Sequence, residues 1–325
     1  ILPPSETPIV PTITPTSSFL AINETTAASV ELLAAYTSHL GSVTDMALLP
    51  GGEQVVSVSY DGENRIWDVL SMQDLHISTS SIENEARVAV IDDDLVVVAR
   101  DGSRKFGGNI VIQNVADGTI VQEFEGRQFP LGVVFSPSGK HIATQNKDYK
   151  TIIVWDVLTG QSIQRISGDW SDTGDRPWTG AFSPDGSILV VLFTNSDLVA
   201  YDVNSGKELH RFMEGGLFEF LGDGEVLAVS RANVIQLYDT RSWELISEFG
   251  DNKLKINFTS FAHHSNIVAI GQFGGEIQIW DMQNGSLLTT LHDPSGFLNM
   301  RFSFDDRYIF TYRGQNGQIN IWGIP

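Results

Sequence analysis

One short segment recurs through this chain and restricts its fold more than any other feature. Asn64-Arg65-Ile66-Trp67-Asp68-Val69 is an apolar, strand-like segment that ends in an aromatic–acid pair. It returns, complete or altered, at intervals of about 40–45 residues. The pairs or their equivalents are Trp67-Asp68, Gln113-Asn114, Trp155-Asp156, Tyr201-Asp202, Tyr238-Asp239, Trp280-Asp281 and Trp322-Gly323. Such a repeat predicts one closed body built from equivalent units, although 325 residues would otherwise suggest two domains.

Each unit has the same internal order. An apolar segment leads into a turn such as Ser183-Pro184-Asp185-Gly186, and a second apolar segment follows. The Trp-Asp segment comes third, and a turn such as Asn204-Ser205-Gly206 leads into a fourth segment. Proline early and glycine late suit a β-turn. Each unit is therefore predicted to hold four short β-strands.

On these residues the chain resembles the WD40-repeat family. The Trp-Asp pairs, their Tyr-Asp variants and the Ser-Pro-Asp-Gly turns carry the resemblance, which covers roughly residues 30–323. It implies an all-β fold, a seven-bladed β-propeller of four-stranded blades. We expect the propeller to span residues 19–325, with the repeated strands ending near residues 68, 114, 156, 202, 239, 281 and 323.

The two ends of the repeat region suggest how the ring closes. No fourth strand follows Trp322-Gly323, whereas residues 30–36 form a strand-like segment with no strand partner nearby in sequence. We expect this N-terminal strand to pair into the last blade as its outer strand, because an open ring would leave two unpaired sheet edges.

Composition excludes several classes of function. The net charge is −20 with only 20 basic residues, which argues against nucleic acid and anionic lipid as partners. The chain has no cysteine, which removes disulfides, thiolate chemistry and cysteine-based zinc sites. No apolar run is long enough to span a bilayer. We expect no cofactor, no bound metal and no direct membrane insertion by the propeller.

Residues 1–18 are rich in proline and threonine and should form an extended linker or leader. We interpret them as a tether that follows a removed signal or lipid-anchored segment. The expected location is therefore extracytoplasmic, in a secreted or membrane-tethered bacterial protein, and a cytoplasmic location is the alternative.

The resemblance also implies a buried hydrogen-bond network in the first unit. The family links a histidine, a serine, an aspartate and the tryptophan, and the matching residues are His39, Ser57 or Ser59, Asp61 and Trp67. We interpret them as structural rather than catalytic, because nothing suggests an oxyanion hole. The other units match this pattern incompletely, and we expect their blades to depend on apolar packing.

The connections that do not repeat are the candidates for binding. Residues 168–178 form a long loop with Trp170, Arg176 and Trp178, and both an interaction surface and a structural role for Trp178 remain open. Asp169, Asp172 and Asp175 of this loop could hold a cation. The other candidates lie in equivalent connections on the same rim. They are Arg104, Lys105, Phe106, Arg231, Phe273, Phe297 and Arg313.

These observations favour a non-catalytic scaffold that binds a protein or peptide through the rim of inter-blade loops. Its cations and aromatic groups would favour a partner with carboxylates. One alternative is a hydrolase or lyase at the channel mouth, although the starts of the inner strands are poor in His, Asp and Glu. A second alternative is a small-ligand or glycan site at the Trp170–Trp178 loop.

Overall fold

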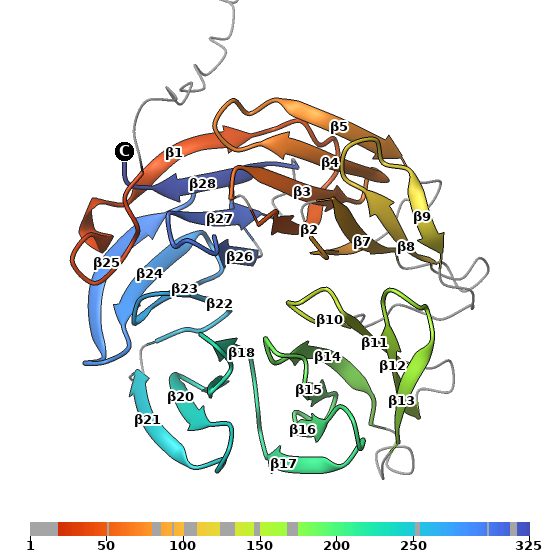
Figure 1. The fold of residues 1–325 in the computed structure, drawn as a ribbon. Coiled ribbons are helices and arrows are strands. Elements are labelled where there is room, and N and C mark those ends of the chain that lie inside the picture. The colour runs from red at the N-terminus through yellow and green to blue at the C-terminus, as the bar shows by residue number, and fades with distance from the viewer. Residues whose placement is uncertain are drawn as a thin grey trace, which may run out of the picture.

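The computed structural model describes residues 19–50, 52–79, 86–92, 94–100, 109–123, 134–145, 150–167, 175–250, 254–297, 299–312 and 317–325. These residues form seven four-stranded antiparallel sheets, which stand as blades around a central axis (Figure 1). Within the described ranges the one helical element is the 3₁₀ turn η1 (Ala27–Ser29), so no described helix is long and apolar enough to cross a membrane. The fold is the all-β, seven-bladed propeller that the repeat predicts.

In six blades the strands follow one another in chain order from the centre of the ring outward, and the seventh differs only in its outermost strand. The first blade holds β2 (Val43–Leu48), β3 (Gln54–Ser59), β4 (Glu63–Asp68) and β5 (Asp74–Thr79). The second holds β6 (Ala86–Val90), β7 (Leu95–Arg100), β8 (Asn109–Asn114) and β9 (Ile120–Glu123). The third holds β10 (Val134–Phe135), β11 (His141–Gln145), β12 (Thr151–Asp156) and β13 (Ser162–Ser167). The fourth holds β14 (Pro177–Phe182), β15 (Ile188–Phe193), β16 (Leu198–Asp202) and β17 (Glu208–Phe212).

The remaining blades follow the same order. The fifth holds β18 (Phe218–Leu221), β19 (Val226–Arg231), β20 (Val234–Asp239) and β21 (Leu245–Gly250). The sixth holds β22 (Phe258–Phe261), β23 (Ile267–Gly271), β24 (Glu276–Asp281) and β25 (Ser286–His292). The seventh holds β26 (Asn299–Phe302), β27 (Tyr308–Tyr312), β28 (Ile319–Gly323) and, outermost, β1 (Glu31–Tyr36). The repeated segment is the third strand of every blade.

In the third and fourth blades, the turn between the first and second strands is Ser136-Pro137-Ser138-Gly139 or Ser183-Pro184-Asp185-Gly186. In the fourth blade, Ser183 Oγ donates to Asp185 at 2.6 Å and accepts the main-chain N–H of Ile188 at 2.9 Å. Gly186 ends the turn with φ +76°, a region that favours glycine. A Cβ there would lie 2.9 Å from Nδ1 of His141 in the preceding blade. The turn residues therefore fix both the local chain reversal and the distance between neighbouring blades.

The N-terminal strand β1 joins the two ends of the propeller. It pairs antiparallel with β28, from Glu31 opposite Gly323 to Tyr36 opposite Ile319. The ring of Tyr36 stacks on Trp67 of the first blade, with centroids 4.2 Å apart. Tyr36 belongs to an apolar cluster that contains residues of both the seventh and the first blade. One strand thus completes the seventh sheet and packs against the first.

The segment before β1 crosses the end of the ring opposite the inter-blade loops. The main-chain N–H of Ile22 donates to the Asp306 carbonyl at 2.7 Å, and Glu24 accepts the N–H of Asn266 at 2.8 Å. The buried Asp306 carboxylate accepts the main-chain N–H groups of His263 and His264, each at 2.7 Å. The sixth and seventh blades and the N-terminal segment are therefore joined by hydrogen bonds as well as by apolar packing.

Candidate interaction surface

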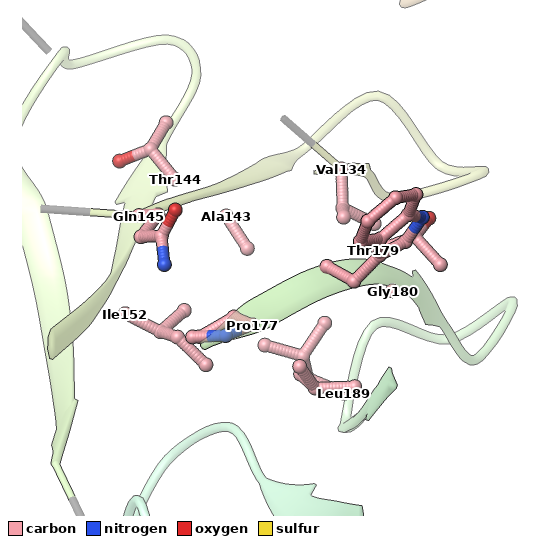
Figure 2. A pocket seen from close by; sticks show the side chains of 11 residues that line it. Val134, Ala143, Thr144, Gln145, Ile152, Pro177, Thr179, Gly180 and Leu189 are labelled. Atoms are coloured by element: carbon pink, nitrogen blue, oxygen red, sulfur yellow. The ribbon is translucent and has the colours of Figure 1, made fainter. Parts of the chain in front are cut away.

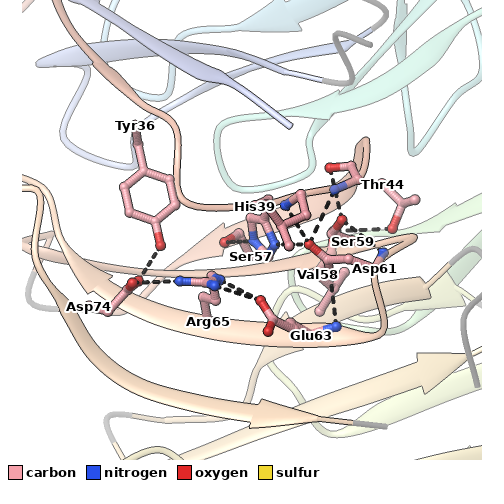
Figure 3. Close-up of polar contacts among 12 residues, drawn as sticks. Tyr36, His39, Thr44, Ser57, Val58, Ser59, Asp61, Glu63, Arg65 and Asp74 are labelled. Atoms are coloured by element: carbon pink, nitrogen blue, oxygen red, sulfur yellow. Dashed lines mark hydrogen bonds and ion pairs between the residues drawn. The ribbon is translucent and has the colours of Figure 1, made fainter. Parts of the chain in front are cut away.

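The predicted network is assembled in the first blade, and Ser57 rather than Ser59 is its serine (Figure 3). His39 Nδ1 lies 3.1 Å from Asp61, and its Nε2 lies 2.8 Å from Ser57 Oγ. The same oxygen accepts the indole N–H of Trp67 at 3.1 Å. Ser59 instead donates to the carbonyl of Gly41 at 3.0 Å. All these bonds form together when His39 Nδ1–H donates to Asp61 and the Ser57 hydroxyl donates to Nε2.

Hydrogen bonds keep the Asp61 carboxylate of this network ionised. Burial alone would raise the pKa of Asp61, but hydrogen bonds from His39 and from the main-chain N–H of Glu63 and Leu40 hold that pKa well below its ordinary value. Nearby, Arg65 pairs with Glu63 and Asp74 at 2.6 Å each, and Asp74 accepts the Tyr36 hydroxyl (Figure 3). Burial, followed by that hydrogen bond, raises the pKa of Tyr36, which keeps the phenol neutral.

The buried network is not arranged for attack on a substrate. Ser57 has no solvent exposure, and its oxygen already accepts the Trp67 indole N–H. His39, Asp61 and Glu63 are the one group of three potential metal-ligating side chains among the described residues, with ligand atoms within 4.8 Å of one another. His39 is bonded at both ring nitrogens, and Glu63 is paired with Arg65. The geometry therefore gives these residues a structural role.

In other blades, threonine forms part of the same hydrogen-bond network. Thr144 accepts the indole N–H of Trp155 at 2.9 Å, and Thr311 accepts that of Trp322 at 3.1 Å. In the seventh blade, Thr311 also donates to the buried Asp293, which stands in place of the histidine. These blades therefore add hydrogen bonds to the apolar packing expected of them, and threonine supplies the hydroxyl that serine supplies in the first blade.

Of its two ends, the propeller exposes more large apolar side chains at the one that we call the loop face, while ten others among the described residues lie on the outermost strands of the blades. The loop face comprises the connections from each fourth strand to the next first strand and from each second strand to the third. Among the described residues, six large apolar side chains are exposed there: Leu40, Tyr60, Trp178, Met213, Leu217 and Phe273. The described strand connections at the opposite end expose two, Leu158 and Phe304.

Several predicted rim residues fall outside the described ranges, namely Arg104, Lys105, Phe106, Trp170 and Arg313, with Asp169 and Asp172 of the cation hypothesis. Arg176 and Trp178 lie at the start of β14 on the loop face. Trp178 is the second residue of this inner strand and is 69% exposed. Asp175 accepts the side-chain amide of Asn195 at 3.2 Å.

Arg231 and Phe273 also lie on the loop face. Arg231 donates to the carbonyl of Met213 at 2.7 Å, so its guanidinium braces the connection between the fourth and fifth blades. Phe273 is 68% exposed, and its ring contacts Phe258 edge-on with centroids 5.4 Å apart. Trp178 and Phe273 are therefore exposed aromatic groups on different blades of one face.

Phe297 is buried, in contrast to its predicted place in the exposed ring. Its exposure is 1%, and it packs in the apolar cluster shared by the sixth and seventh blades. Phe297 can be buried because Gly271 faces its ring. A Cβ on Gly271 would come within 2.7 Å of that ring. A glycine at the end of β23 thus leaves the space that this ring fills. The sequence analysis did not name Leu40 and Met213 as candidates. Each is a large apolar residue in a connection that contains glycine and polar residues, and that pattern could have identified them.

Three innermost strands carry charged side chains that bridge blades. Asp45 on β2 accepts the main-chain N–H of Val88 at 3.1 Å, and Arg301 on β26 donates to the carbonyl of Met46 at 2.7 Å. Burial raises the pKa of Glu219 on β18 to about 7, while Arg301 and the main-chain N–H of Phe261 act in the opposite direction. These groups connect neighbouring blades around the axis.

The closed ring of seven four-stranded blades defines a β-propeller. Comparison with known proteins finds two matching family profiles. The profile of the WD domain, G-beta repeat, matches residues 30–68, and that of eukaryotic translation initiation factor eIF2A matches residues 226–322. The chain thus has a WD40-repeat match, is similar to WD-repeat proteins and folds as a seven-bladed β-propeller. Propellers of this family typically serve as protein-interaction scaffolds.

Individual relatives are distant. An uncharacterized WD repeat-containing protein of Synechocystis is 24% identical over 52% of this chain and 46% of its own length. WD repeat-containing protein SL1-17 of Schistosoma mansoni is 25% identical over 51% of this chain and 55% of its own length. The guanine nucleotide-binding protein subunit beta of rice is 20% identical over 75% of this chain and 69% of its own length. The chain thus spans about half the length of the first two relatives.

Proposed function

We propose that this propeller is a non-catalytic scaffold that binds a protein or peptide through its loop face. The observation that carries the proposal is that six large apolar side chains are exposed on that face, against two in the described strand connections of the opposite end. The six are Leu40, Tyr60, Trp178, Met213, Leu217 and Phe273. Exposed apolar groups that cluster among polar residues are typical of interaction sites. Tryptophan in particular is enriched among the residues that dominate binding energies.

The second support is the rigidity of the scaffold under this surface. Arg231 is hydrogen-bonded to the Met213 carbonyl, and Phe273 packs against Phe258. The main chain of Arg176 exchanges hydrogen bonds with Thr194, at 2.9 and 3.0 Å. A surface held in this way loses little conformational entropy when a partner docks, which favours affinity.

A phage-displayed random peptide library, panned against the purified protein, tests the proposal. The loop-face variant is Trp178→Ser with Phe273→Ser, and the matched control on the opposite end is Leu158→Ser with Phe304→Ser. The control residues are 69% and 70% exposed, so both variants remove similar apolar surface. Enriched peptides should bind the loop-face variant at least about tenfold more weakly than wild type and the control equally well. Peptides that lose affinity only for the control, or a library that yields no binder, contradict the proposal.

A further inference from the structure

Charged side chains on the innermost strands surround the central channel of the ring. Among the described residues of these strands they are Asp45 on β2, Arg87 on β6, Glu219 on β18 and Arg301 on β26. The innermost strands stand around the axis of the propeller (Figure 1). A ligand in the channel would therefore meet charged groups that come from several blades.

Arg301 offers hydrogen-bond donors to this channel. Its guanidinium donates to the carbonyl of Met46 at 2.7 Å, and its Nη2 lies 3.8 Å from the Asp45 carboxylate. These contacts engage only part of a group that carries five N–H donors. The side chain is 45% exposed, although it belongs to the innermost strand of its blade. Water therefore reaches the guanidinium inside the ring, and space for a small ligand adjoins its other donors.

Asp45 does not fully satisfy this guanidinium. The separation of 3.8 Å is too long for a hydrogen bond. The Asp45 carboxylate instead accepts the main-chain N–H groups of Met46 at 3.0 Å and Val88 at 3.1 Å. Arg301 is therefore able to pair with a further acceptor.

Glu219 borders the same space from two blades away. Arg301 is near enough to lower the pKa of Glu219, yet the two side chains form no direct ion pair in the described part of the chain. Burial acts more strongly and raises that pKa to about 7. Below neutral pH the carboxyl group is mostly protonated, and it can then donate its O–H. A guanidinium and a protonated carboxyl group thus lie near each other without being paired.

The seam between the third and fourth blades offers no comparable space. Its cavity measures about 20 Å³, which is room for about one water (Figure 2). Ile152, Pro177 and Leu189 are among the side chains that line it. A ligand larger than water is therefore excluded from this seam.

We infer that the central channel binds a carboxylate, which accepts two N–H groups of Arg301 and the O–H of Glu219. A planar guanidinium matches the two oxygens of a carboxylate in a bidentate pair. A phosphate dianion fits less well, because the nearby Asp45 repels a second negative charge. The inference goes beyond the proposed function, since a free small acid supplies this ligand as well as a carboxyl group of a partner on the loop face does.

The test titrates propionate into the whole protein at about pH 6, where Glu219 is mostly protonated. Saturation-transfer NMR on the ligand measures affinity, and the carbon-13 resonance of the labelled guanidinium places the site. Propionate should shift the Arg301 resonance, with a dissociation constant in about the millimolar range. Propionamide has the same shape without the charge and should not bind at the same concentrations. Inorganic phosphate should bind more weakly than propionate.

Arg301→Lys tests the bidentate pair. Lysine keeps the positive charge and a donor for the Met46 carbonyl but lacks the fork, so propionate should bind at least about fivefold more weakly. Arg231→Lys is the matched control and should leave this affinity unchanged. Arg231 also donates to a main-chain carbonyl at 2.7 Å and lies 4.0 Å from a carboxylate, but it stands on the loop face outside the channel.

Glu219→Gln tests the second contact. Wild type should bind propionate about tenfold more weakly at about pH 8 than at about pH 6, because Glu219 loses the proton that it donates. The amide of the variant donates at both pH values, so its affinity should change by less than about twofold. The other charged or titratable groups of the channel and around Arg301 are the same in both proteins, namely Asp45, Arg87, His263 and Tyr312.

Four results overturn the inference. They are an unmoved Arg301 resonance, propionamide or phosphate that binds at least as tightly as propionate, full affinity in Arg301→Lys, and an unaltered pH dependence in Glu219→Gln. The wild-type titrations decide even if a variant fails to fold.

The source of the carboxylate is tested with the phage-derived peptides. Peptides that propionate displaces support a partner that supplies the carboxyl group, and peptides that bind together with propionate support a free acid as the ligand. A library without binders contradicts the proposed function alone, because the titrations with propionate do not depend on it.

Discussion

Removal of a single hydroxyl group, by Ser57→Ala, tests how the first blade is held together. The Ser57 oxygen bonds His39 Nε2 at 2.8 Å and accepts the Trp67 indole N–H at 3.1 Å. All three side chains are buried. The variant therefore leaves two buried polar groups without partners, and each such group destabilises the fold by about 1–3 kcal/mol. We expect the free energy of unfolding to fall by about 2–6 kcal/mol.

The measurement is the midpoint of urea unfolding, followed by circular dichroism. Ser205→Ala is the matched control, since the Ser205 hydroxyl donates to Asp202 at 2.6 Å on an exposed turn, and it should change stability by less than about 0.5 kcal/mol. A double-mutant cycle with His39→Ala should show coupling of about 0.5–3 kcal/mol, because the residues share one hydrogen bond. If Ser57→Ala unfolds within about 0.5 kcal/mol of wild type, the network does not stabilise the blade as argued.

Three further predictions concern the ring as a whole. Deletion of the chain up to Tyr36 should lower the melting temperature and cause aggregation in size-exclusion chromatography, since β28 loses its partner strand; an unchanged melt would contradict the role given to β1. Asp306→Ala should reduce the free energy of unfolding by at least about 1 kcal/mol, because the N–H groups of His263 and His264 lose their acceptor. Asp223→Ala, in the equivalent exposed turn of the fifth blade, is its control and should be nearly neutral. The folded-state pKa of Glu219, about 7, lies above the ordinary value of 4.5, so the folded protein binds this proton more tightly than the unfolded chain does. Stability should therefore fall as pH rises from 4.5 to about 7, and Glu219→Gln should flatten that part of the urea-midpoint profile; an equally steep profile in the variant would exclude this residue as the cause.

The repeated segment was sufficient to predict the fold because its role is the same in every blade. Third strands such as β12 lie between two other strands and pack against neighbouring blades, so they need apolar residues on both faces. This requirement appears in the sequence as an apolar run such as Ile152-Ile153-Val154. The turns can also be recognised, because positions such as Gly186 need a positive φ and are therefore glycine.

The candidate site was less predictable because exposure depends on neighbours distant in the sequence. Trp178 and Phe297 each stand at or just before an inner strand, yet the first is exposed and the second is buried. The difference comes from Gly271, which leaves space for Phe297 across the blade interface.

The pairing of β1 with β28 has a consequence for how this chain reaches its native state. Leu32 and Trp322, which are opposite each other, are separated by about 290 residues, and closing a loop of that length opposes pairing by roughly 5 kcal/mol. During synthesis β1 emerges first and must wait, with the side chains of Leu33 and Tyr36 uncovered, until its partner strand has been made. At high concentration, β1 of one molecule can pair with β28 of another molecule before its own β28 is available. The strand pairing that closes one ring can therefore join two rings.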